Sequence, residues 1–165
     1  MVAGGEAEFC RTLWPRLAAS MAYLTGDVGA GEDIAQEALT RAWVRWGRVS
    51  RLDAPEAWTY RVAVNLARSR HRRREAEQRA MARAGEDHEA VEVEMADSIA
   101  VRNAVAALPE RTRAALVLRY FADLPVDEVA EILECAPGTV KSLTSQAIER
   151  LRMTMTFDDE VSSDA

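Results

Sequence analysis

Several residue types are scarce in this sequence, and each shortage excludes a class of protein. Aromatic residues make up only 6% of the 165 positions, and there are eight glycines and five prolines. The two cysteines, Cys10 and Cys135, lack the paired spacing of a disulfide framework or a cysteine-based zinc site. No run of eighteen apolar residues occurs, and the N-terminus does not resemble a secretion signal. These shortages predict a helical, cytoplasmic protein without membrane insertion.

Lysine is almost absent, since Lys141 is the only lysine in the sequence. The net charge of −6 disfavours nucleic acid as a partner. The charge is unevenly distributed, however. Residues 68–83 carry seven arginines and two carboxylates, whereas residues 84–100 carry six carboxylates and no arginine or lysine. A basic cluster followed by an acidic stretch predicts contact with a polyanion at one place and repulsion or mimicry at another.

Apolar residues recur at helical spacing in the first half of the chain. Residues 6–24 place them on one face, and residues 34–46 repeat the pattern more cleanly. Trp43 and Trp46 lie on the apolar stripe of the second segment and are expected in the core. The glycines expected to break the chain between the two helices are Gly26, Gly29 and Gly31.

A third helix is expected from Pro55 into the arginine cluster, after a loop over residues 47–54. At about 100° per residue, four polar side chains fall within a stripe about 60° wide, with Trp58 at its edge. They are Arg61, Asn65, Arg68 and Arg72. The opposite side is apolar, which predicts a helix that packs on a core and presents a polar stripe to a partner.

The rest of the chain contains an acidic stretch and a second helical block. Residues 84–98 lack an apolar period and are interpreted as a linker, and residues 157–165 as a disordered acidic tail. Residues 126–134 and 139–153, separated by a short turn, have the pattern of a helix-turn-helix, although a plain three-helix bundle has the same spacing. The expected fold is all-α, with two small helical domains: residues 1–83 and residues 99–156.

The second helix of a helix-turn-helix normally brings its N-terminal end into the major groove of DNA, where side chains reach base edges. The side chains available for this here are Thr139, Lys141, Ser142, Ser145 and Arg152.

Three motifs, in this order, resemble those of extracytoplasmic-function (ECF) RNA polymerase sigma factors, the smallest bacterial sigma subunits. Residues 26–43, with the run EDIAQE, resemble the family's core-polymerase-binding segment. Residues 58–69 look like the helix that recognises the promoter −10 element. Residues 108–152, with the run GTVKS, resemble the −35 module. The preference for arginine over lysine suits an actinobacterial member.

The resemblance implies a dissociable promoter-specificity subunit without catalysis, cofactor or metal. Its partners would be core RNA polymerase, through the largest-subunit coiled coil and the flap, promoter DNA and an anti-sigma factor. The positions that match the coiled-coil contact are Asp33, Ile34, Gln36, Glu37 and Leu39. The positions that match the −10 helix are Trp58, Arg61, Asn65, Arg68 and Arg72. The helix-turn-helix side chains named above match the −35 contacts.

One departure from the family concerns the −35 helix. Relatives commonly carry basic residues further along it, where this chain has Leu143, Gln146 and Ile148. Fewer basic groups make fewer phosphate contacts, which predicts weak or unusual −35 recognition.

The residues alone leave plainer alternatives open. The acidic helix face can be a solvated surface, Trp58 can be a core residue, and residues 84–98 can be a spacer or a mimic of nucleic acid. The alternative function is a stand-alone helix-turn-helix regulator with an N-terminal sensing or dimerising domain. A helical enzyme finds little support, because His71 and His88 are isolated and no metal-ligand spacing is present.

Overall fold

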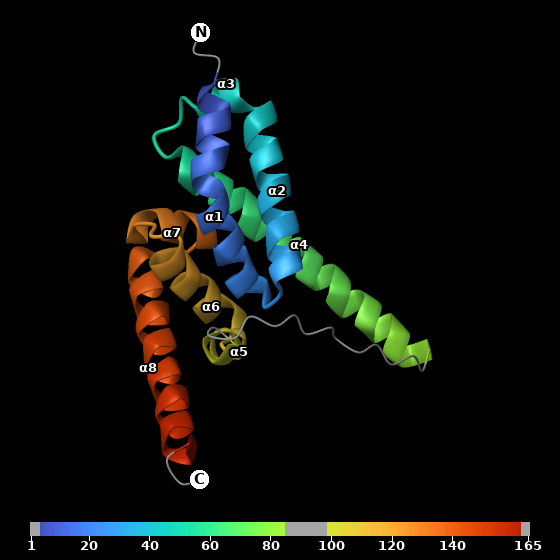
Figure 1. Cartoon of the computed structure of the whole chain (residues 1–165), viewed down its shortest axis with the longest axis vertical. Coiled ribbons are helices and arrows are strands. Elements are labelled where there is room, and N and C mark those ends of the chain that lie inside the picture. Colours follow the sequence, from blue (N-terminus) through green and yellow to red (C-terminus); the bar gives the residue numbers. More distant parts are fainter. Residues whose placement is uncertain (1–3, 85–98, 163–165) are drawn as a thin grey trace.

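The computed structural model describes residues 4–84 and 99–162, without the side chains of 155–162. Within these ranges the chain is helical and contains no strand, in agreement with the predicted all-α class (Figure 1). Residues 85–98, most of the predicted linker, lie outside the described residues. The elements are α1 (Gly5–Thr25), α2 (Val28–Val44), α3 (Trp46–Val49), α4 (Pro55–Ala84), α5 (Ile99–Ala106), α6 (Glu110–Leu116), the π-helical turn η1 (Val117–Phe121), α7 (Val126–Leu133) and α8 (Pro137–Ser162).

A tight turn joins α1 to α2. Gly26 ends α1 in the left-handed region, with φ of 74°, and its N–H donates to the Ala22 carbonyl. Asp27 then caps α2, because its side chain accepts a hydrogen bond of 2.7 Å from the Ala30 N–H. The prediction that Gly29 and Gly31 also break the chain is wrong. Both lie inside α2, because a capped helix tolerates isolated glycines at modest cost.

The first core is built between α1, α2 and α4, with Leu17, Met21, Ile34 and Tyr60 fully buried. The predicted loop over residues 47–54 contains the short helix α3, which buries Val49. The prediction of a core position for Trp43 is also wrong, since 49% of its surface is exposed. At this level of α2 the core is reached by the small side chain of Ala42 instead.

The second block, α5 to α8, contains the predicted helix-turn-helix. Val129 and Ile132 of α7 and Val140 and Ala147 of α8 are all buried, as the apolar spacing predicts. Glu134 adopts the left-handed region, with φ of 52°, and ends α7 before the turn. Helix α8 continues to Ser162, beyond residue 157, where the disordered tail was expected to begin.

The two helical blocks pack against each other, and their buried residues form one continuous cluster. The ring of Tyr23 on α1 lies 4.0 Å, centroid to centroid, from that of Phe121 on η1. Helix α7 lies beside α4, and α5 lies beside α1 (Figure 1). We call this packing the closed arrangement. The outer half of α4 projects from it, with nearly every side chain from Arg72 to Ala84 exposed.

Candidate functional site

The acidic face of α2 presents Asp33, Gln36 and Glu37 to solvent. Two of these groups already have a cationic neighbour within the chain. A carboxylate oxygen of Asp33 lies 3.6 Å from Nη1 of Arg70, and Glu37 accepts a hydrogen bond of 2.8 Å from Nε of Arg41. Exposed pairs of this kind contribute only about 0–1 kcal/mol, so a partner's arginines can replace them at little cost.

The other two residues predicted to contact the polymerase lie on the buried face of α2. Ile34 is fully buried, and only 7% of Leu39 is exposed. Both side chains pack into the core between α1, α2 and α4, which is where the helical period places them once the exposed side is fixed by Asp33 and Glu37. They can position α2 but cannot touch a partner directly.

The polar stripe of α4 lies on the surface as the spacing predicts. Arg61, Asn65 and Arg72 are exposed, and Arg68 is half-buried. The opposite side of the helix faces the core, where Tyr60, Val64 and Ala67 are buried. Trp58, at the edge of the stripe, is half-buried, so it is neither a full core residue nor a fully open one.

The second block covers part of this stripe. An Nη of Arg61 lies 3.4 Å from a carboxylate oxygen of Glu131 on α7, and Nε of Arg68 lies 4.0 Å from one of Glu110 on α6. A groove of about 370 Å³ separates α4 from α7, with Trp58 and Arg61 on one side. The carboxylates of α7 therefore lie against the polar stripe of α4.

Glu128 lines the same groove. Burial raises the pKa of its carboxyl group, and the nearby charges of Glu131 and Glu56 raise it further. The closed arrangement thus holds together acidic groups that repel one another when all are ionised.

Helix α8 presents the predicted −35 side chains between Thr139 and Arg152. Thr139, Lys141, Ser142, Ser145 and Arg152 are all exposed. Two of the three positions that depart from the family are partly committed to packing, since Leu143 and Ile148 are half-buried against the core. The third is exposed, and the amide of Gln146 donates to Oγ of Ser142 at 3.2 Å.

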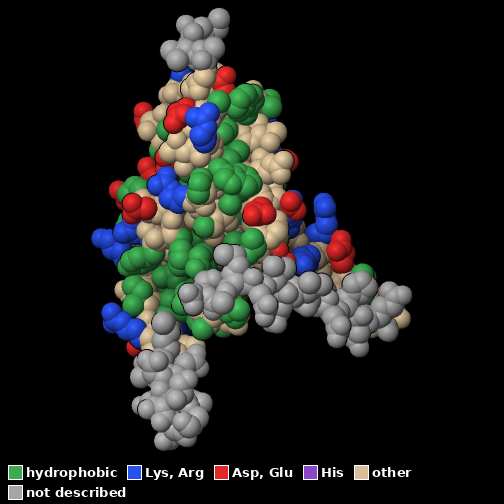
Figure 2. Space-filling view, in the orientation of Figure 1, with side chains coloured by type: hydrophobic (Ala, Val, Ile, Leu, Met, Phe, Trp, Pro, Cys, Tyr) green, Lys and Arg blue, Asp and Glu red, His purple; other side chains and the backbone are tan. Residues whose placement is uncertain are grey.

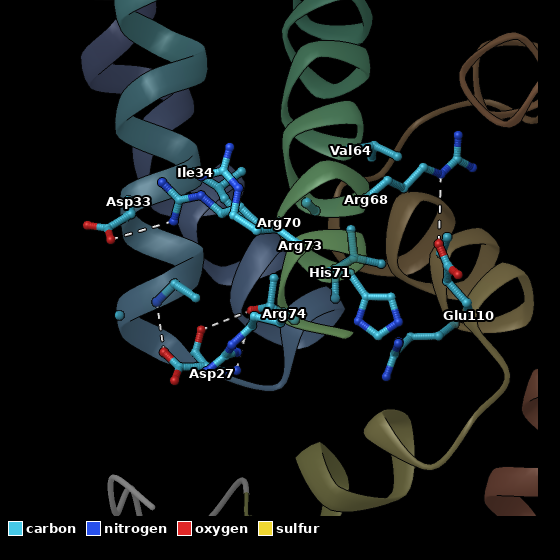
Figure 3. Close-up of a pocket in the computed structure, with 17 residues that line it drawn as sticks. Asp27, Asp33, Ile34, Val64, Arg68, Arg70, His71, Arg73, Arg74 and Glu110 are labelled. Carbon is cyan, nitrogen blue, oxygen red and sulfur yellow. Dashed lines mark hydrogen bonds and ion pairs between the residues drawn. The ribbon is translucent and has the colours of Figure 1, made fainter. Parts of the chain in front are cut away.

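A cavity of about 410 Å³ lies between α2, α4 and α6 (Figure 3). Several arginines of α4 line it together with Arg113 of α6. Figure 2 shows basic and acidic side chains close together where α4 leaves the body of the molecule. The residues that line the cavity are far apart in the sequence, so no local sequence pattern connects them. The high density of arginines over residues 68–74 is the one feature of the sequence that points to a site here.

Comparison with known proteins relates both blocks to bacterial transcription factors. The Sigma-70 region 2 family matches residues 11–77, and the Sigma-70, region 4 family matches residues 98–151. The ECF RNA polymerase sigma factor SigL of Mycobacterium tuberculosis is 31% identical over 163 residues, covering 93% of this chain and 92% of that protein. The chain belongs to the ECF sigma factor family. The sigma factor is therefore a subunit that directs core RNA polymerase to promoters, and a stand-alone regulator is not favoured.

Other relatives agree in sequence and in shape. SigW of Bacillus subtilis is 31% identical over 146 residues, covering 78% of this sigma factor and 77% of its relative. The structure of the sigma factor RpoE of Bartonella quintana, in complex with the anti-sigma factor NepR, superposes with a TM-score of 0.82 at 25% identity, covering 94% of this chain and 99% of that one. No helix among the described residues is long and apolar enough to cross a membrane.

Proposed function

We propose that three exposed faces divide the work of this sigma factor. Asp33, Gln36 and Glu37 of α2 bind the largest subunit of core polymerase. The stripe of α4 binds the −10 element, and the exposed polar side chains of α8 from Thr139 to Arg152 bind the −35 element. The exposure of all three polar α2 side chains, with pairings weak enough to exchange, supports the first assignment.

On α4 the residue types suit a melted strand. The amide of Asn65 can hydrogen-bond a base edge, and the guanidinium groups of Arg68 and Arg72 can meet phosphates. The indole of Trp58 can stack on an unpaired base, because it borders an open groove. Residues 48–55, which run from the end of α3 to the first residue of α4, match the loop that holds the flipped base in the family.

The closed arrangement covers part of the α4 stripe and so opposes this use of it. Glu131 and Glu110 pair with Arg61 and Arg68 in the place that phosphates would take. We infer that the second block moves off α4 when the protein joins polymerase and DNA. Since the closed arrangement is similar to that of RpoE in its complex with NepR, we infer that an anti-sigma factor also binds this protein and holds it closed.

Sigma factors are transcription initiation factors without catalytic chemistry, and we assign none to this one. We place its action in the cytoplasm, where bacterial polymerase works. Weak −35 recognition remains part of the proposal, because half-buried Leu143 and Ile148 offer no charge to the phosphates on this part of α8.

Run-off transcription with sigma-free core polymerase and a promoter library tests this assignment. Asp33→Ala and Glu37→Ala are expected to weaken co-elution with core enzyme, and Asn65→Ala to relax −10 preference while core binding persists. Glu77→Ala is the control, because Glu77 is an exposed carboxylate on the projecting half of α4. Loss of core binding in Asn65→Ala, or an equal loss in Glu77→Ala, would show that the faces are wrongly assigned. No specific initiation by the native protein would refute the proposal as a whole.

A further inference from the structure

The cavity between α2, α4 and α6 has an apolar floor. Leu24, Ala67 and Ala114, each 3–7% exposed, form it, so the floor combines residues of α1, α4 and α6. Its volume of about 410 Å³ falls within the range of about 300–1,000 Å³ that is typical of small-molecule sites. Its location between two helical blocks is also one where such sites commonly occur.

The rim of the cavity is strongly basic. Five arginines line it, against three carboxylates, and His71 lies between the α2 and α6 sides (Figure 3). The arginines are Arg68, Arg70, Arg73, Arg74 and Arg113. One carboxylate, that of Asp27, is already bonded as the cap of α2. The rim of the cavity therefore carries a net positive charge, and the floor beneath it is apolar.

Several guanidinium groups on this rim have N–H donors that remain available for a ligand. Neither Arg73 nor Arg74 forms a hydrogen bond or ion pair with any other part of the chain that the structure describes. Arg70 and Arg68 reach their carboxylates only at 3.6 Å and 4.0 Å. Pairs at these distances are weak, so both groups can turn to a ligand.

Arg113 adds a donor from the other block. Its Nη1 donates to the Ala106 carbonyl at 2.9 Å, which fixes the side chain, while its buried Nε has no hydrogen-bond partner among the described residues. Burial lowers the pKa of this guanidinium, which still stays charged near neutral pH. A desolvated arginine of this kind favours an anion more strongly than an exposed one does.

We propose that this cavity binds a nucleotide, with its phosphates on the arginine rim and its base on the apolar floor. Arginine forks bind phosphate oxygens in pairs, and a flat base offers apolar surface to Leu24 and Ala67. A simple anion would use the rim alone. The combination of a basic rim and an apolar floor is what distinguishes a nucleotide from inorganic phosphate here.

The nucleotide is linked to the closed arrangement. Glu110, Arg113 and Ala114 of the lining come from the second block, and the rest of the lining comes from the first, so the complete cavity exists only while α6 lies beside α4. A ligand that binds one arrangement better shifts the equilibrium toward it. Bound nucleotide would therefore stabilise the closed arrangement and oppose entry into the polymerase complex.

Isothermal titration calorimetry of the full chain with ATP, GTP and tripolyphosphate tests the site. We expect at least one nucleotide to bind about tenfold more tightly than tripolyphosphate, which carries the phosphates without the base. The double variant Arg73→Gln/Arg74→Gln is expected to weaken that binding by about tenfold or more. The matched control is Arg79→Gln/Arg83→Gln, which removes the same charge from the same helix outside the cavity and is expected to leave binding unchanged.

Three results would overturn the proposal: no nucleotide binding at millimolar concentration, equal binding of tripolyphosphate, or an equal loss in the control variant. All four substituted side chains are exposed, so folding should persist, and circular dichroism verifies it. The titration needs neither polymerase nor DNA. Its failure is therefore distinguishable from a failure of the proposed roles of α2, α4 and α8.

Discussion

Substitution of Gly31 by alanine should show how closely α1 and α2 approach each other. A β-carbon on Gly31 would lie 2.4 Å from the backbone nitrogen of Ala22, 2.6 Å from its Cα and 2.9 Å from the carbonyl carbon of Met21. All three are backbone atoms of α1, so no flexible side chain can turn aside. The two helices must separate by close to an ångström to restore ordinary van der Waals distances.

The expected magnitude is the balance of two terms. Overpacking of a close-packed core costs about 1–3 kcal/mol, and this case belongs at the upper end because backbone must move. Alanine in place of a helical glycine recovers up to about 1 kcal/mol. The net expectation is a loss of about 2 kcal/mol in the free energy of unfolding. For a chain of this length, such a loss in the free energy of unfolding corresponds to a fall of several degrees in Tm.

Thermal and urea unfolding, followed by circular dichroism, measure this loss. Gly47→Ala is the matched control, because Gly47 also lies in a helix but a β-carbon there would meet nothing within 4 Å. It should be neutral or slightly stabilising. If Gly31→Ala proved as stable as Gly47→Ala, the close approach of α1 and α2 would be refuted, and with it the placement of the acidic face on α2.

Three further results are expected. Phe121→Ala removes the ring contact with Tyr23 and should loosen the closed arrangement, seen as a larger radius of gyration in small-angle scattering; an unchanged curve would contradict the contact. Because the pKa of Glu128 is raised, its protonation favours the folded, closed form, so this contribution to stability is lost as pH rises from the ordinary carboxyl range through the raised value. Glu128→Gln should flatten that part of the stability profile, with the charges of Glu131, Glu56 and Arg61 left in place around it. An unaltered profile would argue against this role of Glu128. Lys141→Ala should reduce the salt dependence of promoter binding by about one unit of log–log slope, and an unchanged slope would remove Lys141 from the DNA contacts.

Local periodicity was enough to predict much of the helical fold. The apolar spacing of α1, α2 and α7 has a direct physical cause, because each helix must bury one face. The polar stripe of α4 was predictable for the same reason. Gly31 was misread, because its role depends on the backbone of Ala22 in another helix, and a glycine inside a helix and a glycine that ends one look alike in sequence.

The candidate site could be predicted from the sequence only where its residues all lie on one helix. The pairing of Arg61 with Glu131 joins residues seventy positions apart, and no periodicity connects them. The exposure of Trp43 likewise depends on the tertiary structure, because the apolar stripe of a helix can extend beyond the core on which the helix packs. Covering of the α4 stripe by the second block is a property of tertiary packing alone.

The position of the single lysine has a practical consequence. Lys141 is exposed near the start of α8, on the helix proposed to enter the major groove. An amine-specific reagent can therefore modify only this side chain and the N-terminal amine. Acetylation would remove one charge from the −35 face without altering any arginine on α4. A labelled Lys141 would thus report promoter engagement by the second block separately from that of the first.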